Sequence, residues 1–281
     1  MSRMRVAVVI ACFDDGATLP DALASLEGQE PHELVVVDDG STDDATVELM
    51  DELWAKGVRV VRQENAGLSA ARMAGVAASE ATYVLPLDAD DALPAGAVTR
   101  LADALDADPV AAVAWGDLEV FGDISLRVRG ARALDPWHIT YLNEIPVAAL
   151  VRRSSLLAAG GWQIEGYEDW DLWMRFAELG FRGVYVPGTA LLYRRHGYRM
   201  NAGCLDNHGE KLVELRSRHP RLWQERRLNW RRSSVSWRVR ALSPLVAALP
   251  LVSAYDKHRL YRLVSRPHEV LPGRRARLRA S

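Results

Sequence analysis

The sequence predicts an α/β fold: a mostly parallel β-sheet with helices on both faces, followed by a basic helical C-terminal tail. Over roughly the first 90 residues, short apolar runs alternate with helical patterns. The runs are apolar at almost every position, which is typical of parallel strands buried on both faces. With 281 residues, of which 49% are hydrophobic, the chain can bury one full core and either a second small lobe or a helical tail.

The first region contains four strand patterns and three helix patterns. Strands are expected at residues 6–11, 34–37, 58–61 and 83–87. Helices are expected at residues 19–29, 47–54 and 68–78. The second helix follows a run of residues whose side chains can cap a helix N-terminus: Ser41, Thr42, Asp43 and Asp44.

The rest of the chain adds further strands and a tail of different character. Strands are expected at residues 110–120, 126–129, 145–151, 184–186 and 190–193, with a helix starting near residue 168. From about residue 206 the pattern becomes helical and basic, with Trp223, Trp230 and Trp237 spaced by seven residues. We therefore divide the chain into residues 1–205 and a C-terminal extension, residues 206–281.

The net charge of −2 hides an uneven distribution along the chain. Residues 211–281 hold 18 of the 35 Lys and Arg residues but only 4 of the 37 Asp and Glu residues. An acidic N-terminal region suits cation binding, whereas a basic extension suits anionic lipid headgroups or an acidic polymer. We expect the extension either to contact an anionic membrane surface or to pack on the acidic region as a helical cover. No nucleic-acid partner is expected.

Cysteine content and hydropathy bear on the compartment. Cys12 and Cys204 are too few for a disulfide framework and are typical of a reducing compartment. No stretch reaches the roughly 18 apolar residues needed to span a bilayer. The longest candidate, residues 242–255, is interrupted by Pro244 and Pro250. We expect a cytoplasmic protein. The basic extension leaves open that the protein binds peripherally to the inner face of the membrane.

Acidic residues follow three of the predicted strands at the point where each strand ends. They are Asp14 and Asp15, then Asp38 and Asp39, then Asp88, Asp90 and Asp91. Ligands of parallel sheets bind outside the carboxyl ends of the strands, so these clusters should converge on one edge. Converging carboxylates repel one another unless a cation or hydrogen-bond donors lie between them. The alternative is that each Asp only caps the next helix, which is credible for Asp43 and Asp44.

Five segments, taken in order, resemble the motif series of family 2 inverting glycosyltransferases, whose fold is of the GT-A type. The segments are VVIACFDDGATLPDALASLEGQ, ELVVVDDGSTDDAT, ENAGLSAARMAGVAAS, YVLPLDADDALP and GGWQIEGYEDWDLWMRFAELG. The resemblance covers about residues 5–200 and makes residues 1–205 the catalytic domain. It implies transfer of a sugar from a nucleotide-sugar donor, with a UDP-sugar expected, to an acceptor hydroxyl.

The resemblance also assigns the donor side of the site. Asp90 is the expected ligand of Mn²⁺ or Mg²⁺, with Asp88 near the metal or the ribose and His196 as a further ligand of the metal or diphosphate. Asp91 remains open between a metal ligand and a helix cap. The residues expected to bind the donor are Ala11, Phe13, Asp39, Arg72 and Asp88, with Arg72 pairing with phosphate, and Arg194 or Arg195 as further phosphate partners.

The acceptor side is assigned to the last motif. Asp169 is the expected catalytic base, because inversion requires a carboxylate that takes the proton from the attacking hydroxyl. Glu168 is expected to cap or orient it, Trp162 to stack on a sugar ring, and Trp170 to lie on the same side. The alternative for Asp169 is a helix N-terminal cap. Asp171 is expected to be structural.

Two other functions remain as alternatives. A nucleotidyltransferase acting on a sugar phosphate would carry a Gly- and Arg-rich loop after the first strand, and ACFDDGATLP is not such a loop. A catalytically degenerate nucleotide-sugar-binding protein would lack some of the expected carboxylates, and none is missing. The acceptor stays open between a glycan, a lipid-linked sugar and a small hydroxyl compound, since fold analogy does not identify it.

Overall fold

The computed structural model describes residues 4–123, 125–195, 207–249 and 252–265, and it divides the chain into two compact units. The sheet unit consists of Met1–Leu134 and Glu144–Gly197. The helical unit consists of Asp135–Asn143 and Tyr198–Ser281. The helical unit therefore includes residues 135–143. The division predicted from the sequence, at residue 205, places these residues in the N-terminal region instead.

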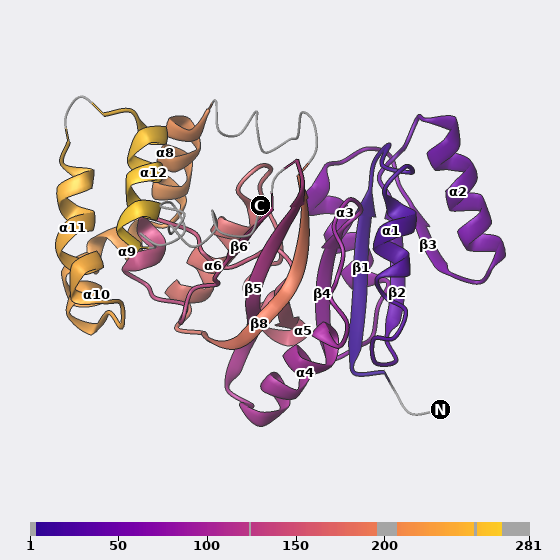
Figure 1. Ribbon diagram of the computed structural model, residues 1–281, viewed down its shortest axis with the longest axis horizontal. Coiled ribbons are helices and arrows are strands. Elements are labelled where there is room, and N and C mark those ends of the chain that lie inside the picture. The colour runs from indigo at the N-terminus through magenta and orange to yellow at the C-terminus, as the bar shows by residue number, and fades with distance from the viewer. Residues whose placement is uncertain (1–3, 124, 196–206, 250–251, 266–281) are drawn as a thin grey trace, which may run out of the picture. The chain divides into compact units, whose positions relative to one another are not determined.

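The sheet unit is built on an eight-stranded sheet, in which the order is β3-β2-β1-β4-β7-β5-β6 and β8 pairs with β5 (Figure 1). The strands are β1 (Val6–Cys12), β2 (Glu33–Asp38), β3 (Arg59–Arg62), β4 (Tyr83–Asp88), β5 (Ala111–Gly122), β6 (Leu126–Val128), β7 (Leu150–Arg152) and β8 (Arg182–Arg195). β1 lies between β2 and β4 and is parallel to both. This is the point at which the strand order reverses, where α/β folds form their ligand sites.

Helices cover both faces of this sheet. They are α1 (Leu19–Ala24), α2 (Asp44–Ala55), α3 (Leu68–Ala77), α4 (Ala97–Ala107), α5 (Arg153–Ala158) and α6 (Glu168–Glu178). Residues of α1, α2 and α4 share one apolar core with Val6, Val8 and Ile10 of β1. On the other face, α3 packs so closely on β1 and β2 that a Cβ on Gly75 would lie 2.2 Å from Cγ1 of Val9. Glycine at this position lets α3 approach the sheet.

The structure confirms the α/β fold with helices on both faces, but the sheet is more mixed than predicted. β7 is antiparallel to β4 and β5, and β6 is antiparallel to β5. The predicted strand at residues 145–151 shrinks to Leu150–Arg152, because Pro146 cannot donate to a ladder. The two strands predicted at 184–186 and 190–193 are one strand, β8, which passes Pro187 and Gly188 with shifts in its register to β5.

One predicted helix is also shorter than expected. The helix expected at residues 19–29 ends at Ala24, and turns carry the chain on to β2. Asp43 is the N-cap of α2, where its carboxylate accepts a hydrogen bond from the backbone N–H of Thr46 at 2.9 Å. The capping alternative is therefore correct for Asp43.

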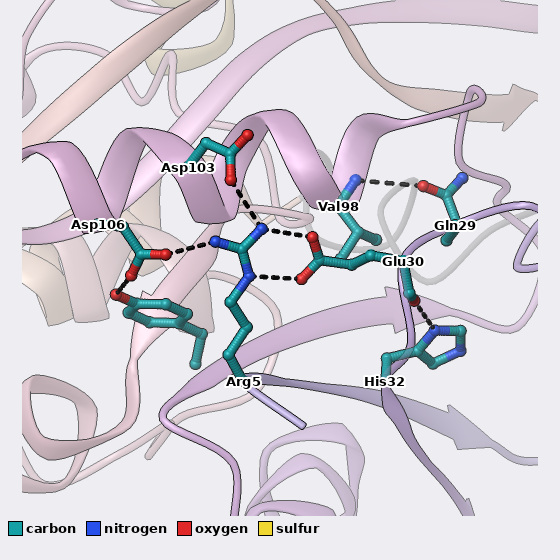
Figure 2. Close-up of polar contacts among 8 residues, drawn as sticks. Arg5, Gln29, Glu30, His32, Val98, Asp103 and Asp106 are labelled. Carbon is teal, nitrogen blue, oxygen red and sulfur yellow. Dashed lines mark hydrogen bonds and ion pairs between the residues drawn. The ribbon is translucent and has the colours of Figure 1, made fainter. Parts of the chain in front are cut away.

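Arg5 fastens the start of β1 to neighbouring elements. Figure 2 shows its guanidinium between Glu30, which lies just before β2, and two carboxylates of α4, Asp103 and Asp106. Its Nε donates to Glu30 at 2.8 Å and its Nη2 donates to Asp103 at 2.7 Å. The phenol of Tyr83, at the start of β4, donates to Asp106 at 2.5 Å. The network thus joins β1, β2, β4 and α4 at the end of the strands away from their carboxyl ends.

We expect Arg5→Gln to lower the free energy of unfolding by about 1 to 2 kcal/mol, because it leaves three carboxylates close together without their shared cation. Urea denaturation followed by circular dichroism measures the change. Arg182→Gln is the matched control, since Arg182 is exposed and pairs with a single carboxylate, Asp108, at 3.2 Å. The control should change the stability by less than about 0.5 kcal/mol. Equal effects of the two variants would contradict a special role for Arg5.

The helical unit is built from α8 (His208–Arg218), α9 (Pro220–Gln224), α10 (Arg226–Arg232), α11 (Trp237–Ala247) and α12 (Ala254–Ser265), together with a short 3₁₀ turn at His138–Thr140. Its core contains Trp137, Tyr141 and Leu142 from the first segment, packed with Val239 of α11 and Tyr261 of α12.

Polar contacts also bind residues 135–143 to the rest of the helical unit. Asp135 accepts hydrogen bonds from the hydroxyl of Ser233 at 2.9 Å and the backbone N–H of Ser234 at 2.8 Å. The guanidinium of Arg226 lies 4.6 Å from the ring centroid of Tyr141. Among the described residues, every helix is too short or too polar to cross a membrane.

Candidate active site

The carboxyl ends of β1, β2 and β4 meet at one edge of the sheet. Cys12 pairs with Asp38 of β2, and Ala11 pairs with Asp88 of β4. The backbone N–H of Asp39 donates to the carbonyl of Cys12 at 2.9 Å. Because these strands are parallel and in register, the acidic residues that follow them converge, as the sequence predicts.

Three carboxylates gather just beyond β4. Asp88, Asp90 and Asp91 each offer an oxygen within 4.8 Å of the others. Asp88 and Asp90 are partly exposed, whereas Asp91 is fully buried. Hard, negatively charged oxygens at this spacing fit Mg²⁺ or Mn²⁺, and the partial exposure of two of them leaves a side open to a phosphate. The described residues thus provide a set of ligands suited to a divalent cation.

The end of β8 holds this carboxylate loop from the other side. Ala92 and Leu192 exchange two backbone hydrogen bonds, of 3.0 and 2.8 Å. The backbone N–H of Arg194 donates to Asp91 at 2.8 Å, and its side-chain Nε donates to the carbonyl of Asp90 at 2.9 Å. Asp91 therefore does not cap the next helix, whose N-cap is Gly96.

Arg194 also binds Asp21 of α1 at 2.6 Å, so its guanidinium spans α1, the carboxylate loop and β8. These contacts of Arg194 hold Asp90 in position. They were not predicted from the sequence. Whether Arg194 also meets a donor phosphate stays a prediction, as it does for Arg195.

Arg72 lies at the centre of the site. It is only 1% exposed, and its guanidinium pairs with Asp88 at 2.6 Å, Glu168 at 3.0 Å and Asp169 at 3.4 Å. The sequence predicts that Arg72 pairs with donor phosphate, and that role stays a prediction. In the structure its partners are carboxylates, and it joins the end of β4 to the start of α6.

Asp169 is the second residue of α6, with 18% of its side chain exposed. Burial raises the pKa of Asp169 above its usual range, and the charges of Glu168 and Asp88 raise it further. Arg72 and the indole N–H of Trp162, which donates to Asp169 at 3.2 Å, act in the opposite direction. A carboxylate held at a fixed angle with a raised pKa suits general base catalysis.

The two tryptophans expected on the acceptor side, Trp162 and Trp170, are buried. Trp162 is 4% exposed, and Arg72 lies 5.7 Å from its ring centroid. In the structure the indole N–H of Trp162 donates to Asp169, and stacking of Trp162 on a sugar ring stays a prediction. Trp170 is equally buried, with its ring 5.5 Å from that of Tyr167. The place of both residues on the acceptor side stays a prediction.

The loop before α6 is docked on the N-terminus of α3. The carboxylate of Glu165 accepts hydrogen bonds from the backbone N–H groups of Leu68 at 3.2 Å and Ser69 at 3.0 Å. The hydroxyl of Ser69 donates to the carbonyl of Ile164 at 2.6 Å. An acidic side chain at a helix N-terminus is stabilised by the helix dipole. Sequence analysis missed Glu165, whose partners lie almost 100 residues away.

The residues predicted to bind the nucleoside differ in their exposure to solvent. Phe13 is 44% exposed at the end of β1, and Ala11 lies beneath the surface. Asp39 is buried, and its carboxylate accepts hydrogen bonds from Gln63 at 2.7 Å, Ala66 at 2.9 Å and Gly67 at 3.0 Å. These contacts shape the turn before α3, and the donor-binding role of Asp39 stays a prediction. His196 lies outside the described residues.

Asp14 links two loops at the same edge. It has a φ of 55° and accepts hydrogen bonds from the backbone N–H groups of Thr42 at 2.7 Å and Asp43 at 2.9 Å. These bonds lower the pKa of the Asp14 carboxyl. Asp14 is thus a turn residue that holds the loop after β1 to the loop after β2, and it does not cap α1.

An acidic edge at the point where the strand order reverses, faced by a carboxylate at the start of α6, lies where α/β enzymes bind their ligands. The model of glycosyl transferase family 2 matches residues 7–156. The uncharacterized glycosyltransferase Rv0539 of Mycobacterium tuberculosis is 31% identical over 204 residues, covering 67% of this chain and 88% of the relative.

Solved structures support the same fold. Residues 1–349 of the TarS protein of S. aureus, in complex with UDP-GlcNAc, align with a TM-score of 0.61 and 15% identity, over 93% of this chain and 82% of that TarS fragment. The mannosyltransferase PcManGT of Pyrobaculum calidifontis, in complex with GDP-Man and Mn²⁺, aligns with a TM-score of 0.59 and 19% identity, over 96% and 88%. The chain belongs to glycosyl transferase family 2 and has the GT-A fold. It is a glycosyltransferase.

We expect Arg194→Gln to weaken Mn²⁺-dependent binding of UDP by roughly 10- to 100-fold, because residues behind metal ligands fix their orientation. Calorimetry with UDP at varied Mn²⁺ measures the change. Arg182→Gln is the control, since Arg182 is an exposed arginine at the other end of the same strand. If both variants weaken UDP binding equally, the loss reflects the removal of a positive charge and not the loss of the hydrogen bond from Arg194 to Asp90.

Proposed function

We propose that this chain transfers a sugar from a UDP-sugar to an acceptor hydroxyl with inversion at the anomeric carbon. One observation carries the proposal: Arg72 pairs with both Asp88 and Asp169. The carboxylates suited to a cation that would neutralise the donor diphosphate and the carboxylate suited to the acceptor hydroxyl are thus separated by a single guanidinium. An in-line displacement needs the leaving group on one side of the anomeric carbon and the attacking hydroxyl with its base on the other, and this arrangement supports it.

The donor side rests on the carboxylate cluster. Asp88 and Asp90, with Asp91 behind them, are the residues that would hold Mn²⁺ or Mg²⁺. The cation, when bound, supplies positive charge against the diphosphate of the departing nucleotide. Arg194 keeps the carbonyl and carboxylate of this loop in place through its bonds to Asp90 and Asp91.

The acceptor side rests on Asp169. Its carboxylate takes the proton from the acceptor hydroxyl as the hydroxyl oxygen forms its bond to the anomeric carbon. The bond from that carbon to the phosphate oxygen breaks at the same time, and the nucleoside diphosphate leaves with the electron pair. A raised pKa strengthens Asp169 as a base while leaving it ionised above that pKa. Trp162 and Arg72 hold its angle.

The nucleotide base of the donor and the chemical class of the acceptor are more specific proposals. UDP is favoured by the nucleotide named for TarS, while GDP-Man in PcManGT keeps guanine nucleotides as a competing donor class. The acceptor is proposed to be a glycan, a lipid-linked sugar or a small hydroxyl compound, with the protein acting in the cytoplasm or at the inner face of the membrane. Family membership disfavours the nucleotidyltransferase alternative.

The direct test is a panel of UDP- and GDP-sugars incubated with the purified protein and Mn²⁺. We expect slow release of the nucleoside diphosphate from one UDP-sugar, because a bound donor is open to attack by water. EDTA should abolish the release. Release from GDP-sugars alone would overturn the UDP assignment, and product sugar with retained configuration would overturn inversion.

We expect Asp90→Asn to weaken Mn²⁺-dependent binding of UDP by at least about tenfold while leaving thermal unfolding unchanged, since Asp90 is a partly exposed ligand outside the core. Calorimetry with UDP and Mn²⁺ measures affinity. Asp123→Asn, in an exposed turn after β5, is the control. Wild-type affinity in Asp90→Asn would remove Asp90 from the metal site.

We expect Asp169→Asn to lower kcat by roughly 10² to 10⁴, as for other lost general bases, with little change in UDP affinity. In the wild type, kcat/KM should fall as pH drops through the raised pKa of Asp169, because only the ionised form accepts a proton. The variant should lose this acidic limb. If UDP affinity collapses together with kcat, Asp169 belongs to the donor site and another carboxylate is the base.

A further inference from the structure

Helix α11 buries one face in the helical unit. Val239 and Ser243 are buried, and Val246 is partly buried. Val239 joins the core formed with Trp137 and Tyr261, and Val246 packs against that core. These positions recur every three or four residues, so they define one side of the helix.

The opposite side of α11 is exposed and almost wholly apolar. The exposed residues are Trp237, Arg238, Ala241, Leu242, Pro244 and Leu245, followed by Ala248 and Leu249 just after the helix. Trp237 is 72% exposed and Leu245 is 63% exposed. A helix face turned toward water normally carries polar residues, yet Arg238 is the one charged residue among these eight. A continuous apolar surface of this kind indicates a binding surface.

The charge around this surface is strongly positive. Residues 226–255 contain six arginines and no Asp or Glu. Arg231 and Arg232, at the end of α10, and Arg238 are exposed. A hydrogen bond of 3.3 Å from the indole N–H of Trp230 to the carbonyl of Arg240 ties α10 to α11. The arginines therefore lie beside the N-terminal end of the apolar face.

We infer that the exposed face of α11, with Arg231, Arg232 and Arg238, binds the surface of an anionic lipid bilayer. Apolar side chains, a tryptophan and flanking arginines match the acyl boundary, the interface and the phosphates of such a surface. An eleven-residue helix is too short to cross the bilayer and would lie in its plane. A second copy of the chain fits less well, because it would bring two arginine clusters together.

Flotation of the full chain with vesicles tests this inference. We expect the protein to float with vesicles of phosphatidylglycerol and phosphatidylcholine at low salt, and to stay behind with vesicles of phosphatidylcholine alone. Trp237→Glu and Leu245→Glu should each reduce binding by about tenfold or more, since each removes a large apolar contact and adds an acid. Glutamate at position 237, in the first turn of α11, favours the helix, and Leu245 is 63% exposed in the last turn, so the fold should survive either substitution.

Two substitutions match these variants in chemistry and exposure. Trp54→Glu replaces a tryptophan on α2 that is 71% exposed, and Val213→Glu replaces a valine on α8 that is 70% exposed. Both should bind vesicles like the wild type, and all four variants should hydrolyse donor sugar at the wild-type rate. Arg231→Gln with Arg232→Gln should weaken binding to anionic vesicles about 25-fold, at roughly fivefold per arginine.

Three outcomes would overturn the inference. The first is a wild-type protein that does not float with anionic vesicles. The second is equal loss of flotation in the α11 variants and their controls, which would indicate a general charge effect. The third is a drop in oligomeric mass, or a rise in protease sensitivity, in Trp237→Glu without a change in flotation. That result would assign the face to a second copy or to a packed cover on the acidic part of the chain.

Discussion

The guanidinium of Arg72 is the interaction on which the site depends. Burying an arginine is costly unless carboxylates pair with it, and Arg72 has three of them: Asp88, Glu168 and Asp169. They come from β4 and α6, whose positions in the chain are about 80 residues apart. One buried cation therefore decides how the two sides of the site are spaced. Its own position depends on Gly75, which lets α3 approach β1.

The carboxylates around Arg72 outnumber the positive charges that pair with them. Three acids share Arg72, and Asp90 and Asp91 lie beyond them. The excess explains why burial and neighbouring charge raise the pKa of Asp169 and why the carboxylates after β4 suit a divalent cation. Arg194 opposes this repulsion by holding the loop through its backbone and side chain. In the proposed reaction, the excess of negative charge thus supports cation binding on the donor side and the raised pKa of Asp169 on the acceptor side.

The first half of the fold followed closely from local sequence. The β1, β2 and β4 strands are continuous apolar runs, and parallel strands must end at one edge, so the convergence of Asp38, Asp39 and Asp88 was predictable. The antiparallel pairing of β7 was not, because a three-residue strand after Pro146 has no distinct pattern.

The parts of the site that were missed depend on long-range packing. The contact of Arg194 with Asp90 joins residues 104 positions apart, and that of Glu165 with Ser69 joins residues 96 apart. Local periodicity indicates which face of a helix is apolar, but not which distant backbone groups a polar side chain will meet. The burial of Trp162 has the same origin, since it depends on how the loop before α6 docks on α3.

The assignment of residues 135–143 to the helical unit makes that unit discontinuous in sequence. A strip of chain from the middle of the protein supplies Trp137 and Tyr141, while the helices that cover them come from beyond residue 207. The tail is therefore not a detachable appendage that recombination or truncation could exchange freely. A chain cut at residue 205 would leave two large aromatic side chains without their partners in α11 and α12, and would expose them to water.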